Sequence, residues 1–183
     1  MKKILLALTL LAVIPNAQAK DKEEIQKVLV KNDADKYVFE GVVNVDGAAA
    51  DMMYKRAKEW VIANLKTGDN NIQFDDEKKS IVNSATIVIK QERSGMASFS
   101  STLVNFKLNL QFKDGRYKFV IDNVVAGYSV YNRDIVTPYS DKMVPSWNKY
   151  NSYLIEKINN AMADVAAELD GAIKGKAASN DNW

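Results

Sequence analysis

The sequence predicts an α+β fold in which a curved antiparallel sheet carries helices packed on one face. The expected elements follow one another as strand, helix, four strands and helix, so there is no regular alternation of strands and helices that would indicate a parallel sheet. Apolar residues alternate on both sides of Asp114-Gly115, which is typical of a hairpin. Two further segments have apolar residues at helical spacing. An antiparallel sheet with its helices on one side buries all of these apolar faces.

The N-terminus is typical of an export signal. Lys2 and Lys3 form a positive start, residues 4–14 are apolar, and Ala17-Gln18-Ala19 is a cleavage site of small residues. We therefore expect residues 1–19 to be a signal peptide and the mature protein to be periplasmic or extracellular. No later apolar run approaches the roughly 20 residues of a membrane-spanning helix, so no span is expected in the mature chain.

Composition excludes several classes of function. The chain has 25 Lys+Arg and 23 Asp+Glu, and the signal peptide removes two lysines and no acid, which leaves 25 − 2 = 23 of each sign. Such a balance gives no electrostatic footprint for nucleic acid, so none is expected as a partner. The chain has no His and no Cys, which excludes disulfides, zinc sites built on these residues and the commonest nucleophile–base pairs. We expect no metal and no cofactor.

The first part of the mature chain predicts a charged arm, a strand and a helix. Residues 20–36 are highly charged and are expected to form an N-terminal arm. Residues 37–45 have the alternation of a strand, which Asp46-Gly47 ends. Residues 50–66 predict an amphipathic helix, and Trp60 is expected to face the sheet as a core residue. The apolar stripe of this helix is Met53, Ala57, Trp60, Val61 and Leu65.

Four strands are expected next. A short strand at residues 71–74 and a strand at 81–92 flank a polar turn. Asp114-Gly115 then joins two strands whose register it fixes. This register places Phe112 opposite Tyr117, Leu110 opposite Phe119 and Leu108 opposite Ile121.

Residues 126–147 show no period and are expected to form a long loop, which in a compact domain is often functional. A long helix is predicted to start at Pro145-Ser146, with Ser146 as its N-cap, and to end near Gly171 or Gly175. A single domain is thus expected over residues 37–175, followed by a disordered tail at 176–183.

Three segments together resemble a known family. They are residues 37–47 (Tyr-Val-Phe-Glu-Gly-Val-Val-Asn-Val-Asp-Gly), residues 53–60 (Met-Tyr-Lys-Arg-Ala-Lys-Glu-Trp) and residues 113–117 (Lys-Asp-Gly-Arg-Tyr). Over about residues 37–125 the chain resembles the DUF4468 family, secreted domains of unknown function typical of Bacteroidota. The resemblance implies a TATA-binding-protein-like (TBP-like) fold and an exported location, and it supplies no catalytic residues.

Motifs that could carry catalysis have simpler explanations. A glycosidase needs two carboxyl groups held across a cleft, whereas the acids of Asp75-Asp76-Glu77 are neighbours in a turn and are expected to be solvated. Ser146 and Lys149 match the Ser-x-x-Lys motif of penicillin-interacting enzymes, and Lys66-Thr67-Gly68 matches their Lys-Thr-Gly motif, but the two occur in the reverse order. The sequence therefore does not predict an enzyme.

Four aromatic residues in the expected loop are candidates for ligand binding, because no periodic face assigns them to the core. They are Tyr128, Tyr131, Tyr139 and Trp147. We interpret the protein as an exported, non-enzymatic binding or accessory module of the bacterial envelope. Its ligand would be an apolar or amphipathic small molecule, or another envelope protein, in a groove between the sheet and the final helix. The alternatives are a carboxylate-based hydrolase and a purely structural envelope protein.

Overall fold

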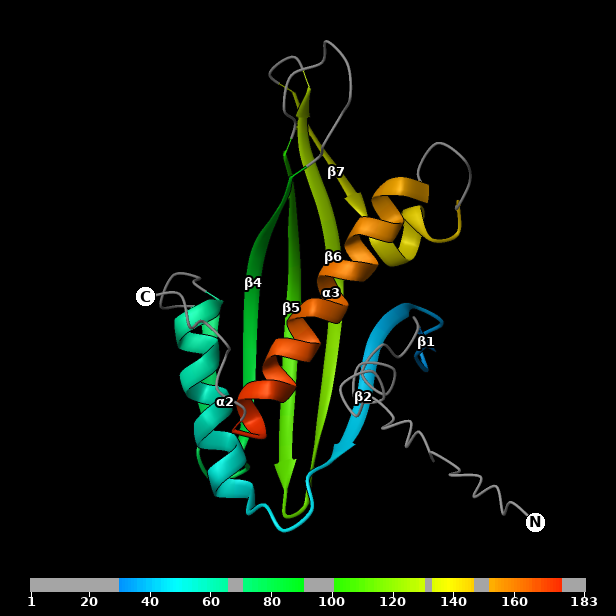
Figure 1. Ribbon diagram of the computed structural model, residues 1–183. Coiled ribbons are helices and arrows are strands. Elements are labelled where there is room, and N and C mark those ends of the chain that lie inside the picture. Colours follow the sequence, from blue (N-terminus) through cyan, green and yellow to red (C-terminus); the bar gives the residue numbers. More distant parts are fainter. Residues whose placement is uncertain (1–29, 66–70, 91–100, 131–132, 147–151, 176–183) are drawn as a thin grey trace, which may run out of the picture.

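The computed structural model describes residues 30–65, 71–90, 101–130, 133–146 and 152–175. These residues form one seven-stranded antiparallel sheet in the order β1-β2-β6-β5-β4-β3, with β7 paired to the far half of β6 (Figure 1). The strands are β1 (Val30–Lys31), β2 (Tyr37–Asn44), β3 (Ile72–Asp75), β4 (Ser80–Lys90), β5 (Ser101–Lys113), β6 (Arg116–Val130) and β7 (Arg133–Pro138). The predicted α+β class and antiparallel sheet are confirmed.

Two helices and one π-helical turn complete the described chain. They are α2 (Ala50–Asn64), η2 (Tyr139–Met143) and α3 (Ser152–Ile173). Figure 1 shows α3 crossing the sheet diagonally with α2 beside it. Neither helix of the described ranges has the combination of length and apolar character that crossing a membrane requires.

The turn between β5 and β6 has the predicted register and an additional role. Leu110 pairs with Phe119, and Gly115 adopts a φ of +73°, which glycine accepts without strain. Asp114 Oδ1 accepts a hydrogen bond of 2.8 Å from the backbone N–H of Ala50. Ala49, at the N-cap position of α2, makes no side-chain cap, so Asp114 caps this helix from a distant part of the chain.

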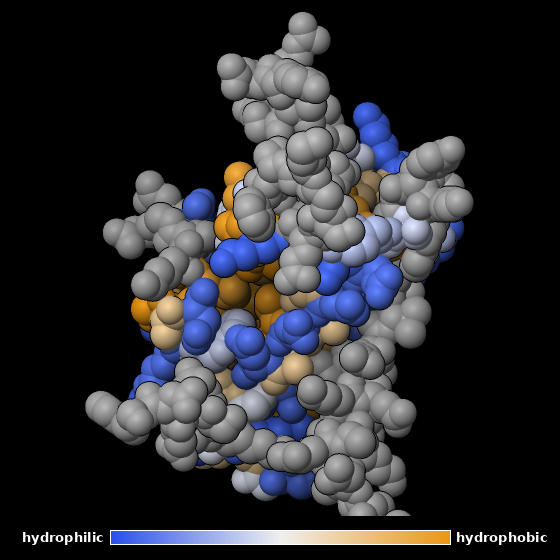
Figure 2. Space-filling model, turned by 45° about the horizontal axis from the view of Figure 1, so that its top comes forward, coloured by the Kyte–Doolittle hydropathy of each residue, from blue (hydrophilic) through white to orange (hydrophobic). Residues whose placement is uncertain are grey.

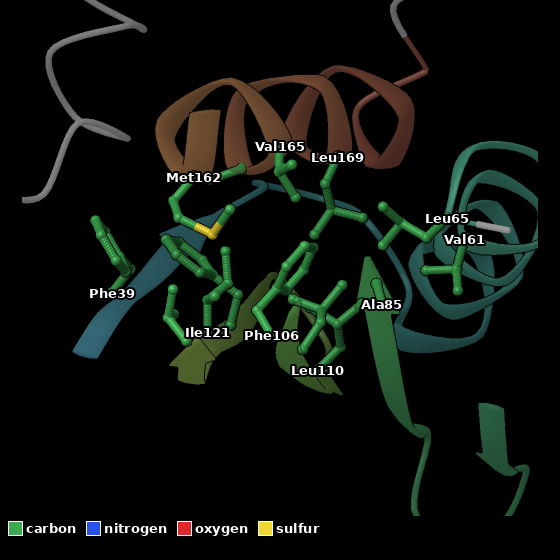
Figure 3. Close-up of a cluster of buried hydrophobic side chains, with 14 of the residues drawn as sticks. Phe39, Val61, Leu65, Ala85, Phe106, Leu110, Ile121, Met162, Val165 and Leu169 are labelled. Atoms are coloured by element: carbon green, nitrogen blue, oxygen red, sulfur yellow. The ribbon is translucent and has the colours of Figure 1, made fainter. Parts of the chain in front are cut away.

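The side chains of both helices fill the space above one face of the sheet. Figure 3 shows Met162 and Leu169 of α3 pointing toward side chains of the central strands, among them Phe106, while Val61 of α2 approaches from the side. Each of these four side chains is at most 3% exposed. Figure 2 shows the opposite, hydrophilic side of α3, with hydrophobic surface visible next to the helix. The core therefore lies between the helices and this face of the sheet.

The segment at residues 126–147 is not the long loop that the lack of periodicity indicated. The far half of β6 pairs with β7 from Val125 opposite Pro138 to Val130 opposite Arg133, and η2 follows directly. The alternation of apolar and polar residues is weak here because this part of the sheet extends past the end of α3 (Figure 1). The pairing between strands, which a search for periodicity does not detect, determines this region.

Other boundaries also differ from the predictions. Val30 pairs with Val38 and Lys31 with Tyr37, so these two residues of the expected arm belong to the sheet. Helix α3 begins at Ser152, and the Ser146 hydroxyl donates to the carbonyl oxygens of Lys142 and Met143, so Ser146 does not cap α3. Trp60 is only partly buried against the core. The expected signal peptide and C-terminal tail lie outside the described residues.

Candidate functional site

The face of the sheet opposite the helices is uncovered along its central strands. Because side chains alternate between faces, Ser84 and Thr86 of β4 and Leu103 and Asn105 of β5 point away from the helices, and all four are exposed. We call this surface the open face. It is the part of the described structure where a ligand could contact a rigid scaffold without displacing the core.

The open face contains a hollow of about 360 Å³ that spans β4, β5 and β6. Amide, hydroxyl and ammonium groups share its lining with the apolar residues Ala85, Phe106 and Val125. The polar lining residues are Asn71, Ser84, Thr86, Asn105, Lys107 and Asn123. We call this site the polar hollow.

A β-bulge shapes the polar hollow. Asn105 pairs with Val125 and Lys107 pairs with Asp122, so Asn123 and Val124 together oppose a single residue of β5. Asn123 has a φ of +51°, a left-handed conformation that asparagine tolerates better than most residues. The bulge buries Val124 on the helix-bearing side and exposes Asn123 beside the hollow.

Two neighbouring side chains make a hydrogen bond across the floor of the hollow. Thr86 Oγ1 donates to Asn105 Oδ1 at 2.6 Å. The carbonyl oxygen of this amide is therefore engaged within the sheet, and its two N–H donors are left to meet a ligand. Lys107 also lines the hollow, and its ammonium group has the Asp122 carboxyl as a neighbour.

Asp122 lies opposite Lys107 and has an unusual environment. Its Oδ1 atom is buried and accepts no hydrogen bond from the described residues. Burial raises the pKa of this carboxyl, and the nearby charge of Lys107 opposes the shift. The pair places one positive and one negative side chain next to each other on the open face.

In the acidic turn Asp75-Asp76-Glu77 the pKa values of both aspartates are lowered, whereas that of Asp122 is raised. Asp75 Oδ1 accepts hydrogen bonds from the backbone N–H groups of Lys78 and Glu77 at 2.8 and 3.1 Å, and these bonds lower its pKa. Asp76 Oδ1 accepts a 2.6 Å hydrogen bond from the Tyr54 hydroxyl, which together with Lys58 lowers the pKa of Asp76. A glycosidase acid requires a raised pKa, so this turn does not fit that role.

A second hollow, of about 460 Å³, lies beside the acidic turn at the β3 edge of the sheet. The described residues contain no group of three or more Asp or Glu side chains arranged to hold a metal ion. The turn thus offers acidic surface without a metal-binding geometry.

Of the four predicted aromatic candidates, Tyr139 is the one whose side chain the structure describes. Tyr139 is fully buried, its hydroxyl is hydrogen-bonded to Asn159, and its ring lies 5.8 Å from that of Phe39, so it is a core residue. Burial raises the pKa of its hydroxyl. Tyr128 is part of β6, while Tyr131 and Trp147 lie outside the described residues. The predicted apolar groove under α3 is filled by side chains.

Sequence reasoning missed the residues of the polar hollow. The polar members of β5, Asn105 and Lys107, appear in the sequence as the solvent-facing half of an alternating strand, which has no functional signal by itself. The available clue was that this strand and its neighbour both carry amides and hydroxyls, such as Thr86, on the same face. The bulge that gathers them requires the pairing with β6.

The structural comparisons agree on the fold. A TBP-like protein from Parabacteroides distasonis superimposes with a TM-score of 0.63 at 12% identity, covering 76% of this chain and 93% of its own. A DUF4468 family protein from Bacteroides ovatus gives a TM-score of 0.62 at 18% identity, covering 89% of this chain and 98% of its own. The comparison with curated proteins found no match. The model of the family described as a domain of unknown function (DUF4468) with TBP-like fold matches residues 39–126. Residues 39–126 of the chain therefore match the DUF4468 family, and the structure has the TBP-like fold of that family.

Proposed function

We propose that the chain is an exported, non-enzymatic binding module of the bacterial envelope that holds a small molecule in the polar hollow. The observation that carries this proposal is the position of the hollow. Its amides, its hydroxyls and Lys107 lie on the face of the sheet that the helices leave uncovered. A concave site with a few convergent polar groups on a rigid scaffold is the usual form of a small-molecule site.

The lining favours binding over catalysis. A carboxylate-based hydrolase needs two carboxyl groups facing each other across the substrate, and none of the residues that line the polar hollow is an acid. Amides and hydroxyls such as those of Asn105 and Thr86 provide hydrogen bonds without a group that titrates near neutral pH. The hollow is therefore suited to holding a ligand unchanged.

The TBP-like fold does not by itself imply nucleic acid as the partner, because one fold serves many functions. The charges of the open face support this view. Lys118 pairs with Glu40 at 3.3 Å, and Lys107 lies opposite Asp122, so this face has no continuous run of positive charge. Binding to a phosphate backbone requires an excess of positive charge that this face does not provide.

Export is proposed from the N-terminal sequence, with cleavage before Lys20. Intact-mass analysis of the protein recovered from the periplasm or medium of expressing cells should give a chain that begins at this residue. A recovered chain that still contains Met1 would contradict export by cleavage.

Photo-cross-linking tests the binding site. The full chain is expressed in Bacteroides ovatus, the source of a solved relative, with p-benzoylphenylalanine in place of Ser84 in the polar hollow. The control carries the same residue in place of Asn160, which is exposed on α3. We expect an ultraviolet-dependent adduct of small mass at position 84 and none at 160. An adduct of protein mass at position 84 would show that the ligand is an envelope protein and not a small molecule. Equal labelling at both positions would refute the site.

A further inference from the structure

A row of exposed apolar side chains crosses the open face next to the polar hollow. The described residues include seven large hydrophobic side chains that are exposed, and three of these are Val88, Leu103 and Val136, at 56%, 48% and 62%. Val88 pairs with Leu103, Leu103 with Gly127, and Gly127 with Val136. Directly paired residues lie on the same face of a sheet, so these four positions form one line across β4, β5, β6 and β7. We call this line the apolar row.

A glycine interrupts the apolar row. Gly127 has no side chain and pairs with both Leu103 and Val136, so no side chain of β6 stands between these two aliphatic side chains. Four strands at a spacing of about 4.8 Å make the row about 14 Å long. An extended dodecyl chain has a similar length.

The apolar row and the polar hollow are adjacent. Leu103 precedes Asn105 by two residues on β5, and Val88 follows Thr86 by two on β4, so the row and the hollow are separated by about 7 Å on one face. The hollow contributes the Lys107 ammonium group and the free N–H donors of Asn105. Apolar contact and hydrogen-bond donors are therefore available side by side.

We propose that the open face binds a single-chain amphiphile with an anionic head, whose chain lies over Gly127 between Leu103 and Val136 and whose head turns into the hollow toward Lys107. This inference rests on the proposed function and names the ligand class. A hydrocarbon chain that covers exposed aliphatic side chains removes apolar surface from water, which lowers the free energy of the complex. A cation beside that line selects a negative head.

Asp122 provides a second test of the preference for an anionic head, through a variant that should strengthen binding. Its carboxylate lies opposite Lys107 and repels an anionic head, and its own Oδ1 is withdrawn from solvent. Asp122→Asn removes this repulsion and leaves the apolar row unchanged, so it should strengthen the binding of an anionic amphiphile. A neutral or cationic ligand would not gain in this way.

The experiment uses the mature chain and three probes with one chain and different heads: dodecanoate, dodecyl phosphate and dodecyltrimethylammonium, each below its micelle concentration. Isothermal titration calorimetry should show one-to-one binding of both anions and at least about tenfold weaker binding of the cation. The two anions share the required chemistry, and the tighter of them indicates whether the natural head is a carboxylate or a phosphate.

Four variants assign the contacts. Leu103→Ser and Val136→Ser should each weaken dodecanoate binding about tenfold, and Lys107→Gln should weaken both anions but not the cation. Val42→Ser is the matched control, because Val42 is 52% exposed on the same face but pairs with Lys118, away from the apolar row. This control should bind as the wild type does.

Several results would overturn the inference. Failure of all three probes to bind, or an equal loss of dodecanoate affinity in the Val42→Ser control, would refute an amphiphile as the ligand. A dimer in light scattering that Leu103→Ser converts to a monomer would show that a second copy covers the row. If the probes fail while position 84 still labels a small molecule, the proposed function stands with a different ligand class. Loss of both signals would refute the two proposals together.

Discussion

The hydroxyl group of Tyr117 on β6 donates a hydrogen bond of 2.8 Å to Oδ1 of Asp170 on α3. Both residues are buried, at 1% and 4% exposure, and the other carboxylate oxygen pairs with Lys174 at 2.9 Å. Burial raises the pKa of the Tyr117 hydroxyl, and the neighbouring carboxylate raises it further. The pair fixes the last turns of α3 on the sheet, because a buried carboxylate must keep its partners.

Tyr117→Phe should lower the free energy of unfolding by about 1–3 kcal/mol, since it leaves a buried carboxylate oxygen without its donor. The ring contact with Phe112, at 6.0 Å between centroids, is retained. Urea unfolding followed by circular dichroism measures the change. Tyr153→Phe, at a position 43% exposed, is the control and should shift stability little. Equal effects of the two variants would show that the Tyr117 hydroxyl is not needed.

Asp114→Ala should destabilise the protein by about 1 kcal/mol, because it removes the acceptor that caps α2 at Ala50. Asp114→Asn keeps an oxygen at the same place and should lose clearly less. Chemical denaturation of the three proteins under one condition makes the comparison. If Asn were as damaging as Ala, the cap would not be the reason for the loss.

The raised pKa of Asp122 predicts a pH-dependent difference between the wild type and Asp122→Asn. Below the unfolded-state pKa of about 3.9, Asp122 is protonated in both states. As the pH rises above this value, the unfolded state releases the proton first, so the wild type loses stability until the folded carboxyl also ionises. The variant has no such loss.

Thermal unfolding of Asp122→Asn and the wild type at pH 3.5 and pH 7 tests this expectation. The variant should be the more stable protein at pH 7, and its advantage should shrink at pH 3.5. An advantage for the wild type at neutral pH would mean that the carboxylate is stabilised in the fold and that the sign is wrong.

The alternation of apolar and polar residues along the sequence predicted the strands that α2 and α3 cover. The hairpin register around Asp114-Gly115 and the pairing of Leu110 with Phe119 were readable because apolar residues occupy every second position on the covered face. Beyond this part the same reasoning was wrong. Strand β7 consists of Arg133–Pro138, which includes Asp134 and ends in a proline. This composition does not favour a strand, so the pairing with β6 makes it one.

The candidate site was less accessible to sequence reasoning than the fold. Tyr139 looked free because no periodic face included it, but η2 places it on the helix-bearing side of the sheet, where it contacts Phe39 and Asn159 of α3. Conversely, Asn105 and Lys107 looked like ordinary solvent-facing residues. Their grouping with Asn123 depends on a bulge between strands, which one sequence does not reveal.

Two glycine substitutions should change stability in opposite directions. At Gly41 a Cβ atom would lie 2.8 Å from Cε1 of Phe119, whose ring packs over this glycine and is 3% exposed. The buried ring has little freedom to move away, so Gly41→Ala should destabilise the protein by about 1–3 kcal/mol. At Gly171 in α3 a Cβ atom would meet nothing within 4 Å. Gly171→Ala should therefore stabilise the helix by about 0.5–1 kcal/mol.

A double variant shows whether the aromatic ring causes the loss at Gly41. Phe119→Leu makes room near the glycine, so adding Gly41→Ala to it should be less damaging than adding Gly41→Ala to the wild type. Denaturant midpoints of the four proteins in this cycle give the coupling. Strict additivity would show that the ring does not resist the methyl group, and the loss would then reflect the backbone of β2 rather than its packing.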